Sequence, residues 1–366
     1  MKAKIVTIID PNYNYGNYLQ NYAVKTVIDS ITGDNSITIS FEKPAQPKWK
    51  SDIKYIVHYI TKFRFAGNKD YWRMYWINQK KNKKFIEFRN KYINTELIDS
   101  ISELGNDDYY IIGSDQVWNP IWYKYSPLKK DMFLLTFAKP EQKICFSPSF
   151  GIEELPQEWK EWFKKHLSTF NRISVREEAG AKIVKELTEK DAEVLIDPTM
   201  MLDAAQWRKI SRKPEKIDCD RPYILTYFLG KRSDRVNADL KKYAKQKNAV
   251  VYNLRDIENI NVYLADPSEF VYLFEHAELI LTDSFHACVF SFIFKRPFLV
   301  YERQDNSGNM MSRLNTLLKK FDIERKYVDS GLDNDVFECD YENGYKLLES
   351  ERVKVIEFLK ESMRLK

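Results

Sequence analysis

Short runs of β-branched and aromatic residues alternate with amphipathic stretches along almost the whole chain. This alternation is typical of βαβ units, in which crossover helices join parallel strands, and it excludes an all-α or an all-β protein. The sequence therefore predicts an α/β protein with parallel sheets. Strands are expected at 4–9, 109–112, 143–146, 172–175 and 194–196 in the first half, and at 223–228, 249–253, 279–282 and 298–301 in the second.

Helical periodicity fills several of the gaps between these strands. In residues 18–31, for example, Leu19, Tyr22, Ala23 and Val27 recur at the spacing of one helix face. Further helices are expected at 234–246, 267–276, 286–294 and 312–321.

The chain divides near its middle. Its 366 residues are enough for two domains, each with its own hydrophobic core. The polar stretch 210–221 lies between the two sets of strands and is interpreted as the connection. We therefore expect an N-terminal domain at 1–209, a C-terminal domain at 210–345, and a C-terminal helix at 346–366 that can pack back on the N-terminal domain.

Cysteine usage and apolar runs indicate the compartment. The four cysteines form no CxxC pair and only four histidines are present, so neither a disulfide framework nor a metal site is expected. The N-terminal apolar run is too short for a signal peptide, and the stretch 287–294 is far below the ~20 residues that span a bilayer. We therefore expect a soluble cytoplasmic protein.

Polar residues at the ends of expected strands are the candidates for a ligand site, because open parallel sheets bind ligands outside the carboxyl ends of their strands. After the first strand, Gly16 allows a tight turn, and the helix that it opens presents N–H groups to an anion. A plain turn with an N-cap would explain the same residues. The carboxamides of Gln20 and Asn21 favour a ligand.

A second corner follows the strand 109–112. It supplies a hydroxyl, a carboxylate, a carboxamide and a stacking ring from one loop, in Gly113, Ser114, Asp115, Gln116 and Trp118. An N-cap beside a core tryptophan is the alternative interpretation. The third corner, around Ser149, is by itself more typical of a simple Pro/Gly turn.

The fourth corner carries the candidate of most interest. Asp283, Ser284 and Phe285 follow a buried strand, and His286 stands at the start of an apolar helix. The positive end of the helix dipole disfavours a protonated histidine unless an anion is bound. This position favours a functional role for His286 over a purely structural one.

Another strand ends at Arg176, again before an expected helix. Its guanidinium can bind a carboxylate or a phosphate through two parallel hydrogen bonds. A surface ion pair with Glu177 or Glu178 is equally compatible with the sequence.

Taken in order, these corners resemble the polysaccharide pyruvyl transferase family. The matching segments are 14–17 with 19–21, 113–119, 174–177, 197–199, and 282–286 with 296–298. The resemblance implies two Rossmann-like domains facing across a cleft, similar to B-type glycosyltransferases. It also implies phosphoenolpyruvate as the donor substrate, with no further cofactor, and a sugar of a cell-surface or exopolysaccharide precursor as the acceptor of the pyruvyl ketal.

By the same resemblance, Arg176 and His286 form the donor-binding and catalytic pair, held on opposite domains. We expect Asp115 or Glu177 to take the proton from the acceptor hydroxyl, with Asp115 as the third catalytic residue. No metal is expected. The expected substrate-binding residues are Asn14, Tyr15, Gly16, Asn17, Gln20, Gly113, Ser114, Gln116, Trp118, Ser149, Glu177, Asp283, Ser284 and Phe285.

Two other functions stay open at this point. A nucleotide-sugar-dependent glycosyltransferase of the same architecture would use helix dipoles and basic residues equally well. A non-catalytic, glycan-binding relative would keep the fold without the chemistry. Nucleic-acid binding is not expected, because no recognised module for it is present.

Positive charge is concentrated in one segment, 48–91, which interrupts the alternation of strands and helices. It holds thirteen Lys and Arg against three Asp and Glu, a net charge of +10, whereas the whole chain carries +5. The segment also contains Trp49, Trp72 and Trp76. Two interpretations remain: a solvated helical face whose aromatic rings pack on the domain, or a surface that docks on an anionic membrane or a lipid-linked acceptor.

Overall fold

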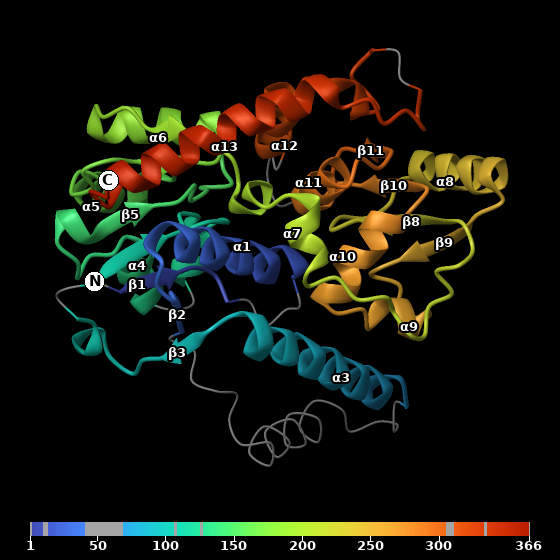
Figure 1. The fold of residues 1–366 in the computed structure, drawn as a ribbon, viewed down its shortest axis with the longest axis horizontal. Coiled ribbons are helices and arrows are strands. Elements are labelled where there is room, and N and C mark those ends of the chain that lie inside the picture. The colour runs from blue at the N-terminus through green and yellow to red at the C-terminus, as the bar shows by residue number, and fades with distance from the viewer. Residues whose placement is uncertain are drawn as a thin grey trace.

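Two parallel sheets form the framework of the protein in a computed structural model (Figure 1). The structure describes residues 2–9, 14–40, 69–105, 108–124, 127–304, 311–332 and 335–365. The N-terminal sheet has the strand order β3-β2-β1-β4-β5, and every neighbouring pair is parallel. Its strands are β1 (Ala3–Val6), β2 (Ile37–Ser40), β3 (Thr95–Leu97), β4 (Tyr109–Ile112) and β5 (Lys143–Cys145).

A short parallel pair, β6 (Ser174–Val175) with β7 (Glu193–Val194), lies beside the end of β5. The N–H of Arg176 donates to the carbonyl of Pro148 at 3.2 Å, which fixes the start of the following helix against the loop after β5.

The second sheet has the order β11-β10-β8-β9, and its pairs are also parallel. Both sheets are covered by helices, as parallel sheets require. The α/β class expected from the sequence is therefore confirmed. The strands are β8 (Tyr223–Tyr227), β9 (Val250–Asn253), β10 (Leu279–Thr282) and β11 (Phe298–Val300).

The helices begin and end where local sequence signals allow. In α1, the side chain of Asn14 caps the first turn by accepting from the N–H of Gly16 at 3.0 Å. A capping box of Asp266 and Glu269 opens α10. The helices are α1 (Tyr15–Thr32), α3 (Lys69–Tyr92), α4 (Pro127–Phe133), α5 (Gln157–Leu167), α6 (Glu178–Thr188), α7 (Ala204–Arg208), α8 (Asp234–Lys247), α9 (Ile260–Tyr263), α10 (Pro267–His276), α11 (Phe285–Ile293), α12 (Met311–Lys320) and α13 (Glu342–Ser362).

Helix α13 runs along both halves of the molecule (Figure 1). Near its start, Tyr345 donates its hydroxyl to the carbonyl of Phe292 in the C-terminal half at 3.0 Å. Just beyond its end, the carbonyl of Met363 accepts from the hydroxyl of Tyr109 on β4 at 2.6 Å. The last helix of the chain thus ties the second half of the protein to the first.

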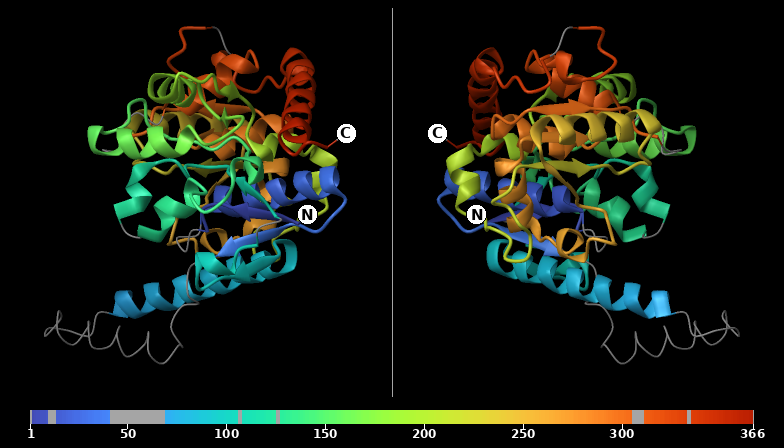
Figure 2. Two further views of the ribbon diagram at one scale, coloured as in Figure 1. Left: turned by 90° about the vertical axis from the view of Figure 1, so that its left-hand side faces the viewer. Right: turned by 90° about the vertical axis from the view of Figure 1, so that its right-hand side faces the viewer.

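Helix α3 forms the described part of the basic segment; of that segment, residues 48–68, with Trp49, lie outside the described residues. It joins the two halves from the side opposite α13 (Figures 1 and 2). Lys84 pairs with Glu269 of α10 at 3.0 Å, and the hydroxyl of Tyr263 donates to Asn78 at 3.1 Å. Part of the segment's charge therefore serves contacts between the two halves, whereas Trp76 is 60 % exposed.

Among the helices that the structure describes, none has both the length and the apolar character needed to cross a bilayer.

Candidate functional site

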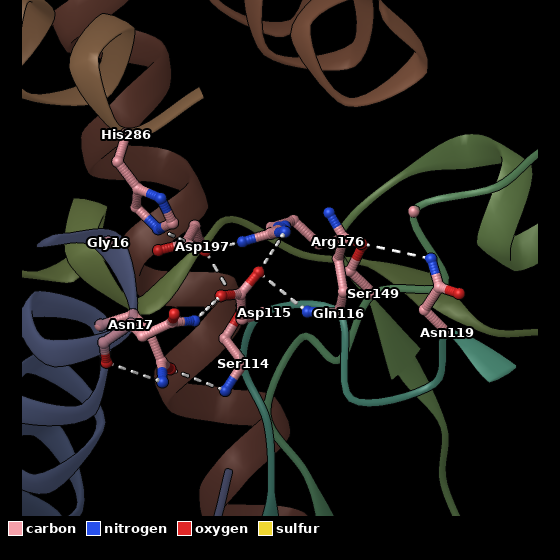
Figure 3. Close-up of polar contacts among 12 residues, drawn as sticks. Gly16, Asn17, Ser114, Asp115, Gln116, Asn119, Ser149, Arg176, Asp197 and His286 are labelled. Atoms are coloured by element: carbon pink, nitrogen blue, oxygen red, sulfur yellow. Dashed lines mark hydrogen bonds and ion pairs between the residues drawn. The ribbon is translucent and has the colours of Figure 1, made fainter. Parts of the chain in front are cut away.

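A buried ion pair between Arg176 and Asp197 forms the centre of the candidate site (Figure 3). The Nη1 of Arg176 donates to Oδ2 of Asp197 at 2.5 Å, and its Nη2 lies 3.5 Å from Oδ1 of Asp115. The face of the guanidinium covers the ring of Phe285 at 4.6 Å. The Arg176 side chain is thus held by two carboxylates and one ring, and the residue is only 3 % exposed.

The charges of this pair are stabilised on both sides. Burial alone would raise the pKa of Asp197, but the neighbouring Arg176 and His286, with hydrogen bonds from Thr199 and Arg176, lower it to about 2. Burial alone would lower the pKa of Arg176, but Asp197, Asp115 and Glu177 outweigh it and raise that pKa. Both groups are therefore charged at neutral pH.

His286 comes from the other half of the molecule, on the first turn of α11. Its Nε2 lies 3.9 Å from Oδ2 of Asp197 and has no hydrogen-bond partner among the described residues. Burial lowers the pKa of His286, although the charges of Asp197 and Asp115 oppose that shift. The ring is therefore neutral at neutral pH, and an added anion would favour its protonated form.

The ring of His286 packs directly on Gly16, across the boundary between the two halves. A Cβ atom added at Gly16 would lie 2.1 Å from Nδ1 of His286, far inside van der Waals contact. Only glycine at this place lets the two halves of the site meet. Its absent side chain, rather than a tight turn, explains the residue.

We therefore expect Gly16→Ala to displace the His286 ring and to lower turnover at least ~10-fold, since a shift of about 1 Å in a reacting group is costly. The measurement is phosphate release from phosphoenolpyruvate, the donor that the resemblance implies, alongside thermal unfolding. Gly105→Ala is the control, because its nearest neighbour is a flexible carboxylate at 3.1 Å. Unchanged turnover in Gly16→Ala would show that the packing of Gly16 against His286 is not required for activity.

The lowered pKa of His286 predicts a pH dependence of stability. The folded protein disfavours the charged ring and the unfolded chain does not, so protonation favours unfolding. Relative to His286→Asn, the wild type should lose free energy of unfolding as the pH falls from about 7 to about 5, and the difference should be constant above about pH 7. Urea unfolding of both proteins across this range measures it; parallel curves would contradict the prediction.

The loop after β4 is locked to the first helix by carboxamides. The Oε1 of Gln20 accepts from the N–H of Ser114 at 2.9 Å, and its Nε2 donates to the Thr7 hydroxyl at 2.7 Å. Asn17 donates to Oδ2 of Asp115, and the Ser114 hydroxyl lies 3.2 Å from Oδ2 of Asp197. The first two corners expected from the sequence therefore meet around the Arg176–Asp197 pair.

Gly113 makes this loop possible. Its φ of +125° lies in a region that other residues rarely adopt, and an added Cβ would lie 2.2 Å from the carbonyl of Phe146. Asn14, which caps α1, is partly exposed.

Trp118 does not present the expected stacking surface. Its ring is fully buried, its Nε1 donates to the carbonyl of Phe133 at 2.9 Å, and it packs on Phe150 at 5.3 Å. Tyr15 is also a packing residue here: its ring stacks on Phe270 at 4.6 Å, between the two halves. For these two aromatic residues, the structure corresponds to the structural alternative rather than to ligand contact.

Two acidic residues of the expected site hold loops. One oxygen of Glu177 accepts from the hydroxyl of Ser149 at 3.0 Å and from the N–H groups of the next two residues. The carboxylate of Asp283 accepts from the N–H groups of Leu229 and Gly230 at 2.7 and 2.8 Å. Asp283 is thus occupied, whereas Oε2 of Glu177 is buried without a partner among the described residues. Ser284 is the N-cap residue of α11 and is buried.

Three residues near the centre were not expected from the sequence as site residues: Asp197, Arg303 and Arg313. Asp197 was noted only within a matching segment, where an Asp before Pro is typical of a helix cap, and it does cap the turn at Thr199. Arg303 lies 3.6 Å from Oδ2 of Asp283. No local signal marks either arginine, because both approach the site only through the fold.

Arg313 is a buried cation on α12 next to two others. Burial, then the charges of Arg176 and Arg303, lower its pKa to about 10, so it remains charged at neutral pH. With the Gln116 carboxamide oxygen turned toward it, the guanidinium donates two hydrogen bonds of 2.7 and 3.0 Å. Three guanidinium groups are therefore gathered around the site.

Several polar atoms at this centre are buried and lack hydrogen-bond partners within the described ranges. Since such atoms are rare in folded proteins, we interpret them as candidate contacts for a polar ligand. Three of them are nitrogen atoms: one guanidinium nitrogen comes from the N-terminal half, and a second guanidinium nitrogen and an imidazole nitrogen come from the C-terminal half. The atoms are Oδ1 of Asn17, Nε of Arg176, Oε2 of Glu177, Nε2 of His286 and Nε of Arg303.

Within the described part of the chain, no group of three or more His, Cys, Asp or Glu residues is arranged to hold a metal ion.

Comparison with known proteins gives one family. The family model described as polysaccharide pyruvyl transferase matches residues 14–306. A search of curated proteins gave no match.

Solved structures match over the full chain, at low identity. The UDP-GlcNAc 2-epimerase from Neisseria meningitidis is 8 % identical, with 100 % of this chain and 94 % of that chain covered and a TM-score of 0.45. The Anabaena protein HepE, solved with UDP and glucose, is 9 % identical, with 100 % of each chain covered and a TM-score of 0.41. At these values the similarities carry no argument about substrates.

Proposed function

Because the chain belongs to the polysaccharide pyruvyl transferase family, we propose that it transfers the pyruvyl group of phosphoenolpyruvate, as a ketal, to a sugar of a cell-surface or exopolysaccharide precursor. One observation supports this most: Arg176 and His286, from different halves, both contact Asp197. Each also retains a buried nitrogen without a partner among the described residues. A small anion that needs both a fixed cation and a proton donor fits that arrangement.

The charge of the donor accounts for the arginines. Phosphoenolpyruvate carries a carboxylate and a phosphate a few ångströms apart, so a site for it must neutralise about three negative charges. Arg176, Arg303 and Arg313 supply three cations, and Asp197 and Asp283 hold two of them in place. In our proposal these guanidinium groups bind the donor and stabilise the phosphate as it leaves.

The reaction needs two additions at one carbon. A proton added to the methylene carbon turns it into a methyl group and leaves an oxocarbenium-like centre at the neighbouring carbon. A sugar hydroxyl attacks that centre and loses its proton, and the bond from carbon to phosphate oxygen then breaks. A second hydroxyl closes the ring, and its proton leaves with the phosphate. Donor and diol thus give the ketal and inorganic phosphate, without an oxidant or a reductant.

We assign the first proton to His286. Its pKa is lowered by burial in the free protein, and the negative charge of a bound donor acts in the opposite direction, toward the value that acid catalysis at neutral pH requires. Asp197, 3.9 Å from Nε2, would stabilise the protonated ring.

Asp115 is the preferred base for the acceptor hydroxyl. It is 7 % exposed, whereas Glu177 is 1 % exposed and fixed by the loop that it holds. Asn17 and the N–H of Gln116 donate to Asp115, which orients its carboxylate.

The test is direct. Phosphate release from phosphoenolpyruvate is followed with a panel of free and lipid-linked sugars, in EDTA because the proposal requires no metal, and NMR identifies the ketal. Isothermal titration with phosphoenolpyruvate, UDP and GDP is run in parallel. Binding of a nucleotide but not of phosphoenolpyruvate would overturn the proposal in favour of a nucleotide-sugar glycosyltransferase.

A further inference from the structure

A cavity of about 600 Å³ opens at the edge of the C-terminal sheet. Its wall includes Phe228, Leu229 and Gly230, which directly follow β8, and Asn253, which ends β9. This is the carboxyl edge of a parallel sheet, where ligands bind, and the volume is that of a small-molecule site. None of its lining residues belongs to the Arg176–Asp197–His286 centre.

The lining is basic. Among the described residues that line it are Lys231, Arg232 and Arg255, and no aspartate or glutamate. Within the described ranges, none of these three cations forms an ion pair with a carboxylate. The Nη1 of Arg255 donates to the carbonyl of Leu229 at 3.1 Å, which holds the guanidinium against the cavity wall. The cavity therefore carries three uncompensated positive charges, unlike the donor site, where carboxylates balance the arginines.

The chemistry of the wall selects among ligands. A neutral sugar is usually held by carboxylates and stacked rings. Phe228 carries the only ring among the described lining residues. It is 6 % exposed and packs on Tyr301 at 5.9 Å, so it offers no stacking face for a sugar or a nucleobase. The wall instead presents positively charged side chains, together with the carboxamides of Asn253 and Gln304. A compact polyanion satisfies that wall best.

The cavity and the donor site share a structural element. The carboxylate of Asp283 holds the N–H groups of Leu229 and Gly230 at the cavity wall, and it lies 3.6 Å from Nε of Arg303. Three residues after Asp283 comes His286. A ligand with its anionic group in the cavity therefore lies next to the donor site.

We propose that this cavity binds a diphosphate ester, the group through which an activated or carrier-linked sugar acceptor is held. The identification of that ester with the acceptor rests on the function proposed above, whereas diphosphate binding itself does not. Three cations around one cavity match the charge of a diphosphate. Because the described wall exposes no ring face to a base or an alkyl chain, most of the affinity should come from the diphosphate.

The test uses isothermal titration of the full chain with inorganic pyrophosphate, UDP and isopentenyl diphosphate. In the double variant Lys231→Gln/Arg232→Gln the Kd for each should rise at least ~10-fold, or about 1.4 kcal/mol. The matched control is Lys241→Gln/Lys245→Gln, which removes the same charge from exposed positions on α8 and should change each Kd less than about 2-fold. Arg176→Lys should leave diphosphate binding unchanged.

The outcomes separate the two proposals. Similar affinities for the three ligands support recognition of the diphosphate alone. Preference for UDP or for the prenyl ester supports the site and identifies the source of the ester. Equal loss in both double variants, loss in Arg176→Lys instead, or no binding at about 1 mM would overturn the site. Binding of phosphoenolpyruvate is measured in a separate titration. Failure of the cavity proposal would therefore not be mistaken for failure of the donor proposal.

Discussion

Arg176→Lys should lower kcat/KM for ketal transfer at least ~10²-fold while the protein still folds. Lysine keeps the positive charge between Asp197 and Asp115, so the buried carboxylates are not left without a cation. It loses the planar fork, however, and with it the Nε–H that has no partner among the described residues. The loss should therefore fall on donor binding and on stabilisation of the leaving phosphate.

Alanine is the wrong choice at Arg176. Removing the cation would leave two buried carboxylates uncompensated, at a cost of about 3–5 kcal/mol in stability, and inactivity would then be ambiguous. Arg172→Lys is the control, since Arg172 pairs with Glu193 and Glu361 at the surface and not with the site. Near-normal turnover in Arg176→Lys, with an unchanged melting temperature, would remove Arg176 from the mechanism.

His286→Gln should lower kcat at least ~10²-fold with a smaller change in KM. Glutamine can place an amide N–H near the position of Nε2, so it can still donate a hydrogen bond to a bound anion, but it cannot deliver a proton. A histidine that acts as an acid must be protonated, so wild-type kcat should fall as the pH rises through the pKa of His286 in the complex. The residual activity of His286→Gln should lack that alkaline limb.

The same variant separates two roles for His286. If the ring only binds the anion, glutamine should retain most of kcat, and the pH profile should not change shape. His276→Gln is the control, because His276 stacks on Tyr272 at the end of α10, away from the site. Loss of the alkaline limb in His286→Gln but not in His276→Gln would assign the proton to His286.

The framework could be predicted from the sequence where strands are fully buried. β4 and β10 lie where continuous apolar runs predicted them. A strand that is covered on both faces is apolar along its whole length, so its first and last residues can be recognised in the sequence. β2 and β3 were not predicted. β2 contains the buried residues Thr38 and Ser40, and the Thr38 hydroxyl donates to Asn21 at 2.8 Å. β3 is a short, largely exposed edge strand. Their strand character depends on neighbours rather than on their own composition.

The candidate site was predictable where strands end and not where helices approach from elsewhere. The positions of Arg176, Asp115 and His286 at strand ends follow from local sequence, and the structure brings all three around Asp197. Arg313 lies on a polar helix whose arrival depends on how α12 packs against α6. Its role as a neighbour of Arg176 is a property of the tertiary structure alone.

The sequence also could not show why Gly16 is glycine. A tight turn or a helix start explains a glycine there equally well, and the contact that excludes a side chain comes from a residue 270 positions later. The same limit applies to Trp118, whose polar surroundings in the sequence suggested a ligand while its ring is buried in the core.

The path of α13 restricts how the two domains can move. Because the chain passes from the first domain to the second and then returns along this helix, the domains are connected at two separate places. A single linker would let one half rotate about any axis relative to the other. Two connections permit mainly rotation of the halves about the line that joins the two connections. We therefore expect any separation of Gly16 from His286 to be a rotation about this single axis, in which α13 bends or slides.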